Sequence, residues 1–259
     1  MKKLTIISFI LLFVWAAGAD WVPIPEDNPT NHKMHSAQTP DEFGIDVGFE
    51  GSILADDWQC SETGNVDDIH FWISWHDDQV VEIDRISVNI YSDIPADQSS
   101  TGYSVPGDVE WSRDFDSGEF NLLRLDDTGL KDWLTPSNNI NEDSFIADNH
   151  VTWDQVNITD IQNPFPQEKG TIYWLGLEIL EDIGSPDYEP ILTAGWKETT
   201  ENWNDDSVWW DSSNLEWVEL INPIIPDPSA NSIDLAFVIT PEPASVLIMA
   251  IGTLLIRKK

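Results

Sequence analysis

Apolar and polar residues alternate along many short stretches of this chain, and this alternation constrains the fold more than any other feature. In residues 69–76, Ile, Phe, Ile and Trp alternate with His, Trp, Ser and His. Because successive side chains of a strand point to opposite faces, the pattern predicts a strand with one apolar face. Further strands are predicted at residues 53–60, 86–91, 109–115, 120–125, 151–158, 171–179, 192–197, 208–210, 216–220 and 233–239.

Turn-forming residues separate several of these stretches. Residues 116–118 read Asp-Ser-Gly and residues 211–214 read Asp-Ser-Ser-Asn, and both sequences favour hairpin turns. No stretch shows a sustained helical stripe with caps, and no repeat of fixed period is visible. The predicted fold is all-β: an antiparallel β-sandwich, jelly-roll-like, over residues 52–240.

The N-terminus has the three parts of a secretory signal. Lys2 and Lys3 precede an apolar run of 14 residues, and Ala17 and Ala19 flank Gly18 just after it. A bilayer span needs about 20 apolar residues, so this run is too short for a comfortable anchor. We predict that residues 1–19 are a signal peptide removed by signal peptidase; a retained signal anchor is the alternative.

The C-terminus combines three features in order. Pro241-Glu242-Pro243 leads into an apolar segment at 244–256, and two Lys and one Arg end the chain. As a helix these 13 apolar residues would cover about 20 Å of a hydrocarbon core about 30 Å thick. The pattern predicts a short transmembrane segment at 241–259 that tethers the protein temporarily, with the cations on the cytoplasmic side. A buried terminal strand is the alternative.

These C-terminal residues resemble the PEP-CTERM sorting domain. The resemblance implies an exported protein that exosortase, a membrane protease, processes near the sorting motif Pro241, Glu242 and Pro243. It also implies a Gram-negative-type host that makes extracellular polysaccharide. The apolar segment is shorter than the family pattern. The body resembles, through residues 55–60, 68–75 and 170–175, an uncharacterised domain of exported proteins with this tail, and that domain brings no activity.

The charge of the body limits its partners. Residues 20–240 hold 7 of the 12 basic residues and 46 of the 47 acidic ones, a net charge of −39. Repulsion of phosphates excludes nucleic acid and disfavours anionic lipid. The body also holds 13 of the 14 Trp, which predicts an ordered domain rather than a disordered acidic chain. Residues 20–51 contain Pro, Asn and His without periodicity and are interpreted as a leader.

Cys60 is the single cysteine, so no internal disulfide can form. We interpret it as a small buried residue on a strand. An intermolecular disulfide is the alternative.

Acidic pairs lie near several predicted strand ends, where loops could bring carboxylates onto a hard cation. The pairs are at 56–57, 67–68, 77–78, 126–127 and 205–206. None has the spacing of an EF-hand, so no cofactor is expected, and structural calcium stays open as an alternative. His70 and His76 lie six residues, about 20 Å, apart along one strand and would not share an ion.

Four tryptophans lie close together near the C-terminal end of the body. Trp203, Trp209, Trp210 and Trp217 have several aspartates between them. An indole can stack on a sugar face while carboxylates accept hydroxyl hydrogen bonds, so these four are candidate glycan contacts. Because adjacent Trp209 and Trp210 must point to opposite faces of a strand, core packing is the alternative for most of them.

No catalytic motif is present: the chain lacks His-Glu-x-x-His, Gly-x-Ser-x-Gly and a phosphate-binding loop. We therefore predict that the protein is not an enzyme. The leading hypothesis is an exported surface or matrix protein with a structural or adhesive role in extracellular polysaccharide. The alternatives are a lectin-like carbohydrate-binding module and, third, an exported glycan-active enzyme.

Overall fold

The computed structural model describes Trp21 and residues 32–125, 129–137, 140–181, 193–227 and 231–240. The predicted signal peptide and the sorting tail lie outside these residues. Within them the chain forms strands β1 to β16 and two short 3-10 turns, η1 (His76–Asp78) and η2 (Glu142–Ser144). These residues contain no helix long and apolar enough to cross a membrane.

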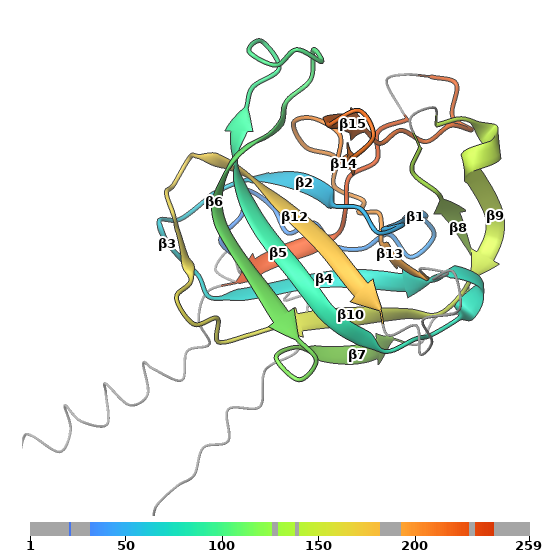
Figure 1. Ribbon diagram of the computed structural model, residues 1–259, viewed down its shortest axis with the longest axis horizontal. Coiled ribbons are helices and arrows are strands. Elements are labelled where there is room, and N and C mark those ends of the chain that lie inside the picture. The colour runs from blue at the N-terminus through green and yellow to red at the C-terminus, as the bar shows by residue number, and fades with distance from the viewer. Residues whose placement is uncertain are drawn as a thin grey trace, which may run out of the picture.

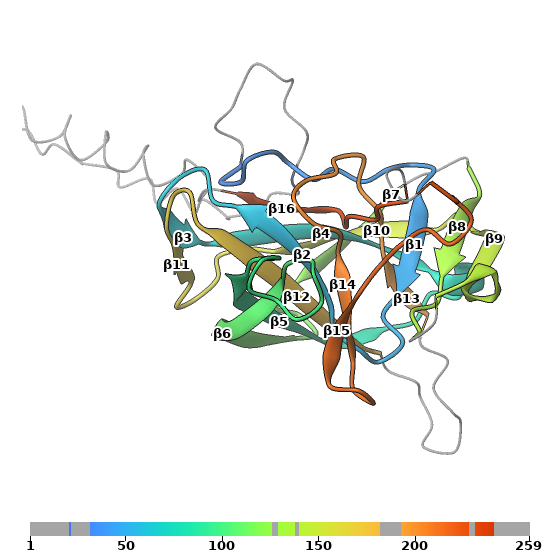
Figure 2. The same ribbon diagram turned by 90° about the horizontal axis from the view of Figure 1, so that it is seen from above.

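Two sheets pack face to face, which confirms the predicted all-β, antiparallel sandwich (Figures 1 and 2). One sheet has six strands in the order β15-β14-β2-β12-β5-β6, and all its neighbours are antiparallel. Its strands are β2 (Leu54–Gln59), β5 (Ile83–Ile94), β6 (Val105–Asp116), β12 (Ile172–Glu181), β14 (Val208–Asp211) and β15 (Glu216–Glu219).

The second sheet has the order β7-β10-β4-β13-β1-β8-β9, with β16 also paired to β4. Its pairs are antiparallel except for β1 with β8, which run parallel. A separate pair, β3 with β11, closes one end of the sandwich. These strands are β1 (Ile45–Gly48), β3 (Gly64–Val66), β4 (Asp68–Trp75), β7 (Asn121–Leu125), β8 (Lys131–Leu134), β9 (Phe145–His150), β10 (Trp153–Ile158), β11 (Phe165–Gln167), β13 (Ala194–Trp196) and β16 (Phe237–Thr240).

Each predicted strand overlaps an observed one, and one of the two predicted hairpins forms. Residues 211–214 connect β14 to β15, which pair with each other. Residues 116–118 do form a turn, but the strands on either side enter different sheets, β6 beside β5 and β7 beside β10. The hairpin predicted there is therefore wrong, because turn residues specify a reversal of direction and not the partner of the next strand.

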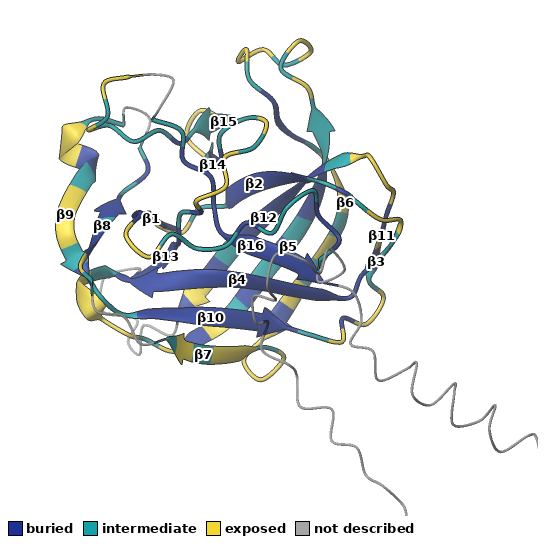
Figure 3. Cartoon of the chain, turned by 180° about the vertical axis from the view of Figure 1, so that it is seen from behind, coloured by how far each residue is buried: buried dark blue, intermediate teal, exposed yellow. Residues whose placement is uncertain are grey.

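The apolar face predicted for β4 is buried, and so is the opposite face, since all eight residues of the strand are buried (Figure 3). Its second face is covered as well. The rings of Trp21 and Trp72 meet edge to face at 5.7 Å, and His70 Nδ1 lies 2.6 Å from Asn157 Oδ1. A central strand covered on both sides carries polar residues inside only where they find partners.

The segment predicted as an aperiodic leader contributes to the sandwich. Strand β1 lies within it, all four of its residues are buried, and it sits between β13 and β8. Before it, Met34 bridges Cys60 and Gln38 bridges Phe237. Ile45 and Val47 alternate with Asp46 and Gly48, so β1 keeps a period of two within a segment that was interpreted as aperiodic.

A fully buried charged group lies on β1. Asp46 accepts hydrogen bonds from Lys197 Nζ at 3.0 and 3.1 Å, and its Oδ2 lies 2.8 Å from His150 Nε2. All three side chains are 0% exposed. Burial by itself raises the pKa of Asp46, but Lys197 and His150 outweigh burial and lower it. This group ties β1 to β13 and β9 without contact to solvent.

Two glycines make room for one tryptophan in the same sheet. Gly48 and Gly195 are paired across β1 and β13. A Cβ added to Gly195 would lie 2.5 Å from the Trp133 ring, and one added to Gly48 would lie 2.8 Å from it. The Trp133 side chain is 0% exposed, so it packs directly on the backbone of this glycine pair.

Candidate functional site

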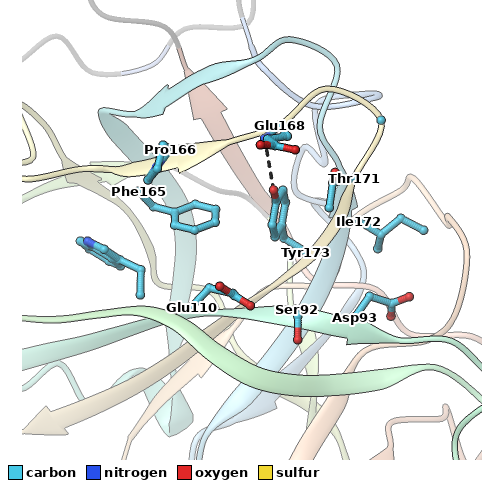
Figure 4. Close-up of a pocket in the computed structure, with 11 residues that line it drawn as sticks. Ser92, Asp93, Glu110, Phe165, Pro166, Glu168, Thr171, Ile172 and Tyr173 are labelled. Atoms are coloured by element: carbon cyan, nitrogen blue, oxygen red, sulfur yellow. Dashed lines mark hydrogen bonds between the residues drawn. The ribbon is translucent and has the colours of Figure 1, made fainter.

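A hollow of about 740 Å³ opens where the β3–β11 pair meets the six-stranded sheet (Figure 4). Three aromatic residues line it: Trp111, Phe165 and Tyr173. Five polar residues also line it: Ser92, Asp93, Glu110, Glu168 and Thr171. Its volume lies within the range of about 300–1,000 Å³ found for small-molecule sites.

A β-bulge in β6 shapes one side of this hollow. Ile90 pairs with Trp111 and Tyr91 pairs with Val109, so Glu110 is an extra residue without a partner on β5. A bulge bends the strand and redirects the side chain that it adds. Figure 4 shows Glu110 along one side of the hollow with residues of β5, and Phe165 on the opposite side.

Contacts around the aromatic residues hold the hollow in shape. Phe165 and Tyr173 pack edge to face with ring centroids 5.1 Å apart, and both are buried. The Tyr173 hydroxyl accepts a hydrogen bond of 3.2 Å from the backbone N–H of Glu168. Trp111 is half-buried, and its Nε1 donates to the Asn163 carbonyl at 3.0 Å. The hollow is therefore preformed by the fold.

The carboxylates at the hollow differ in their surroundings. Asp93 accepts a hydrogen bond of 2.9 Å from Trp174 Nε1, and burial raises its pKa while that bond lowers it. Glu110 and Glu168 are exposed to water. The half-buried ring of Trp111 beside several hydrogen-bond acceptors suits a neutral ligand rich in hydroxyl groups.

The four sequence-predicted tryptophans do not form one surface. Trp209 is buried in the core, whereas Trp210 and Trp217 are half-buried and lie opposite each other on β14 and β15. Trp209 and Trp210 therefore point to opposite faces, as predicted. The Trp210 and Trp217 rings are 5.1 Å apart at an angle of 63°, so they are not coplanar. Trp203 instead packs on His35, with ring centroids 4.0 Å apart.

Trp210 nevertheless borders two further hollows. One, of about 620 Å³, is also lined by Asn141 and Asp211. The other, of about 380 Å³, is also lined by Trp217 and Glu216. The β14–β15 hairpin thus offers a second place where an indole meets polar side chains.

No local sequence pattern indicates the hollow in Figure 4. Strand β11 has only three residues, and Glu110 is redirected by a bulge that depends on how β6 pairs with β5. Trp111 and Phe165 are 54 positions apart in the chain. Their proximity is a property of the tertiary structure.

In the described part of the chain, no three His, Cys, Asp or Glu side chains already stand in metal-binding geometry. His70 contacts Asn157, and His76 packs on Trp133 with ring centroids 5.0 Å apart. The pair at 126–127 lies outside the described residues. Asp56 and Asp57 lie near the pair at 205–206 and are taken up below.

Cys60 is buried, as predicted, and is 1% exposed. Its Sγ lies 3.1 Å from the Glu62 carbonyl oxygen. Burial raises the pKa of the thiol, which disfavours the reactive thiolate.

Residues 34–240 match the family model described as a domain of unknown function (DUF7901), and the chain belongs to this family. The match begins within the segment that the sequence predicts to be a leader and ends at the last residue of β16. No curated protein and no solved structure matches the chain. The family description names no activity.

Proposed function

We propose that this chain is an exported surface or matrix protein whose β-sandwich binds neutral glycan of the extracellular polysaccharide, without catalysis. The observation that carries the proposal is the preformed hollow in Figure 4, where Trp111, Phe165 and Tyr173 lie beside carboxylate and hydroxyl side chains. One face of a sugar ring is apolar and its rim carries hydroxyl groups, so this lining complements both parts.

The charge of the protein supports a neutral glycan. With a net charge of −39 over residues 20–240, the domain repels acidic polysaccharides at low ionic strength. Glu110 and Glu168 can accept hydrogen bonds from hydroxyl groups without requiring a charged ligand.

Binding is favoured over glycoside hydrolysis because of the exposure of the two glutamates. A general acid that works near neutral pH needs a carboxyl group in apolar surroundings. Glu110 and Glu168 face water at the rim of the hollow, and Asp93 is engaged by the Trp174 indole.

Delivery to the surface follows from the two chain ends in this proposal. Signal peptidase removes residues 1–19, the segment at 241–259 tethers the protein to the membrane, and exosortase processes it near Pro243. Mass spectrometry of the protein recovered from the host surface tests this route by locating its two chain ends. A variant with both Pro241 and Pro243 replaced by alanine is the comparison. Recovery of the full-length chain from the cytoplasm, with both ends intact, would refute it.

Glycan binding is tested on the full chain with an array of neutral hexose oligosaccharides, followed by calorimetry of the strongest binder. Trp111→Ala should weaken binding at least about tenfold, or about 1.4 kcal/mol, because it removes the exposed ring face. Trp111→Phe keeps a ring and should retain most of the affinity.

Trp210→Ala serves as the matched control at the β14–β15 hairpin. Loss of binding in this variant, with Trp111→Ala unaffected, would move the glycan site to the hollows around Trp210. An array without any binder would refute the proposed ligand class.

A further inference from the structure

Three distant parts of the chain place five aspartates around β2, with Asp56 and Asp57 on its opposite faces. Asp56 and Asp57 belong to β2, Asp205 and Asp206 precede β14, and Asp234 precedes β16. β14 pairs with the start of β2, and β2 lies between β14 and β16 in Figure 2. We call these five residues the aspartate cluster.

The hydrogen-bond donors to the two aspartates of β2 are neutral. Asp56 accepts from Gln38 Nε2 at 3.1 Å and from the backbone N–H groups of Asp57 and Leu235. Asp57 Oδ2 accepts from Asn204 Nδ2. Neutral donors stabilise a carboxylate less than a positive charge does.

The other members of the cluster have neutral donors too. Asp234 Oδ2 accepts from the Trp203 N–H at 3.3 Å, and Asp205 Oδ2 accepts from the Ser104 N–H at 2.9 Å. Asp206 accepts from the Ser232 hydroxyl. Over the described residues, no lysine or arginine forms an ion pair with any of the five aspartates.

Three buried oxygens in this region have no hydrogen-bond donor: Asp57 Oδ1, Asp234 Oδ1 and Gln38 Oε1. Their side chains belong to residues that are 0%, 1% and 1% exposed. The remaining buried atoms without a partner, within the same described part, are indole and imidazole nitrogens and one serine hydroxyl. The two unpartnered carboxylate oxygens of the described chain thus belong to Asp57 and Asp234, whose charges act on each other, and a cation between them would satisfy both.

Burial and mutual repulsion act on the cluster in the same direction. Burial, followed by the charge of Asp56, raises the pKa of Asp234 to about 9. Burial raises the pKa of Asp57 well above its usual value, and the charges of Asp234, Asp93 and Asp205 add to the rise. Buried carboxylates in this state need either protons or a positive ion.

We propose that the aspartate cluster binds one calcium ion, with Asp57 and Asp234 as central ligands. The site offers only hard oxygen ligands, which calcium takes in numbers of six to eight with flexible geometry. No three carboxylates already stand in metal-binding geometry, as stated above, so binding draws them together. Asp205, Asp206 and Asp234 lie outside the regular strands.

The expected consequence is a cross-link between the two sheets. The ion would connect β2 with the segments that lead into β14 and β16, which belong to different sheets. Because calcium then binds only the folded chain, it stabilises the protein by mass action.

Calorimetric titration of the full chain with calcium chloride at pH 7.5 tests the proposal, together with thermal unfolding in calcium and in EDTA. One ion should bind per chain, and calcium at a hundredfold excess over its Kd should raise Tm by about 5–10 °C. Affinity should fall as pH is lowered, because protons compete for the carboxylates.

Asp57→Asn separates a calcium site from a merely structural aspartate. It removes one charge and one ligand but keeps a polar group of the same size, so it should abolish the calcium-induced rise in Tm. In EDTA its Tm should equal or exceed that of the wild type, because a repulsion is relieved. Asp108→Asn, at an exposed position on β6, is the matched control and should retain the full calcium response.

Two results would overturn the proposal. The first is a titration that shows no binding heat, together with a Tm that calcium leaves unchanged and that acidification raises. Protons, and not calcium, would then neutralise the aspartate cluster. The second is an equal calcium response in wild type and Asp57→Asn, which would indicate weak binding to the acidic surface. Asp234→Asn provides the second variant if Asp57→Asn does not fold.

Discussion

Replacing Lys197 by methionine removes one charge from the buried group on β1 while keeping a side chain of similar length. Lys197 Nζ lies 3.0 and 3.1 Å from the two oxygens of Asp46, and both side chains are 0% exposed. The ammonium group also lies 5.0 Å from the centroid of the Trp153 ring. After the replacement, Asp46 keeps only His150 as a charged or chargeable partner at ion-pair distance.

The expected loss of stability follows from this burial. Removing one partner of a buried ion pair costs about 3–5 kcal/mol, because the remaining charge stays without water. For a domain of this size each kcal/mol shifts Tm by about 2–4 °C, so Tm should fall by about 6–20 °C. Arg85→Met removes one partner of the exposed pair with Asp114, whose side chains are 42% and 54% exposed, and should cost about 0–1 kcal/mol.

Thermal unfolding followed by circular dichroism measures both variants at pH 7. Replacing Asp46 by leucine together with Lys197→Met should restore part of the lost stability, since the double variant also removes the carboxylate that Lys197→Met leaves without its ammonium partner. Equal changes in Tm for Lys197→Met and Arg85→Met would refute the reasoning. So would a double variant less stable than Lys197→Met.

Three further outcomes are expected. Gly195→Ala should lower the free energy of unfolding by about 1–3 kcal/mol, because the added Cβ meets the Trp133 ring. Gly64→Ala is the control and should cause no such overpacking loss, because no atom lies nearer than 3.5 Å to its added Cβ. Urea unfolding measures the free energy of unfolding of both variants. Burial raises the pKa of Glu198 to about 8. The contribution of the protonated side chain to stability is therefore present below pH 4.5 and is lost as pH rises toward 8. Glu198→Gln should raise Tm at pH 8 more than at pH 5. Cys60 should resist alkylation in the folded protein and react in urea. An alkylation rate in the folded protein close to the rate in urea would contradict this expectation.

The strands missed from the sequence share a physical reason. β1, β3, β8 and β11 have three or four residues each; β14 and β15 are equally short, but the turn sequence between them and their tryptophans made them recognisable. β9 is longer, but its sequence Phe-Ile-Ala-Asp-Asn-His places apolar and polar residues in blocks. These strands form because their neighbours offer unpaired backbone groups, and that information is not local.

The candidate sites show the same division. The tryptophans of the β14–β15 hairpin were candidates from the sequence, and all three border hollows, because a hairpin brings nearby residues together. The sequence did not indicate that Trp111 of β6 and Phe165 of β11 line the same hollow. It named the acidic pairs at 56–57 and 205–206 separately, without Asp234 or Gln38.

The sequence by itself determined the all-β class, the position of most strands, the burial of Cys60 and the opposite orientation of Trp209 and Trp210. Each of these depends on the alternation of side chains within one strand or on one local turn. Only the tertiary structure decided which strands pair, which residues line the hollow of Figure 4 and which aspartates share a buried region. Those features depend on contacts between residues far apart in the chain, whose cost in entropy is met by burial of the whole core.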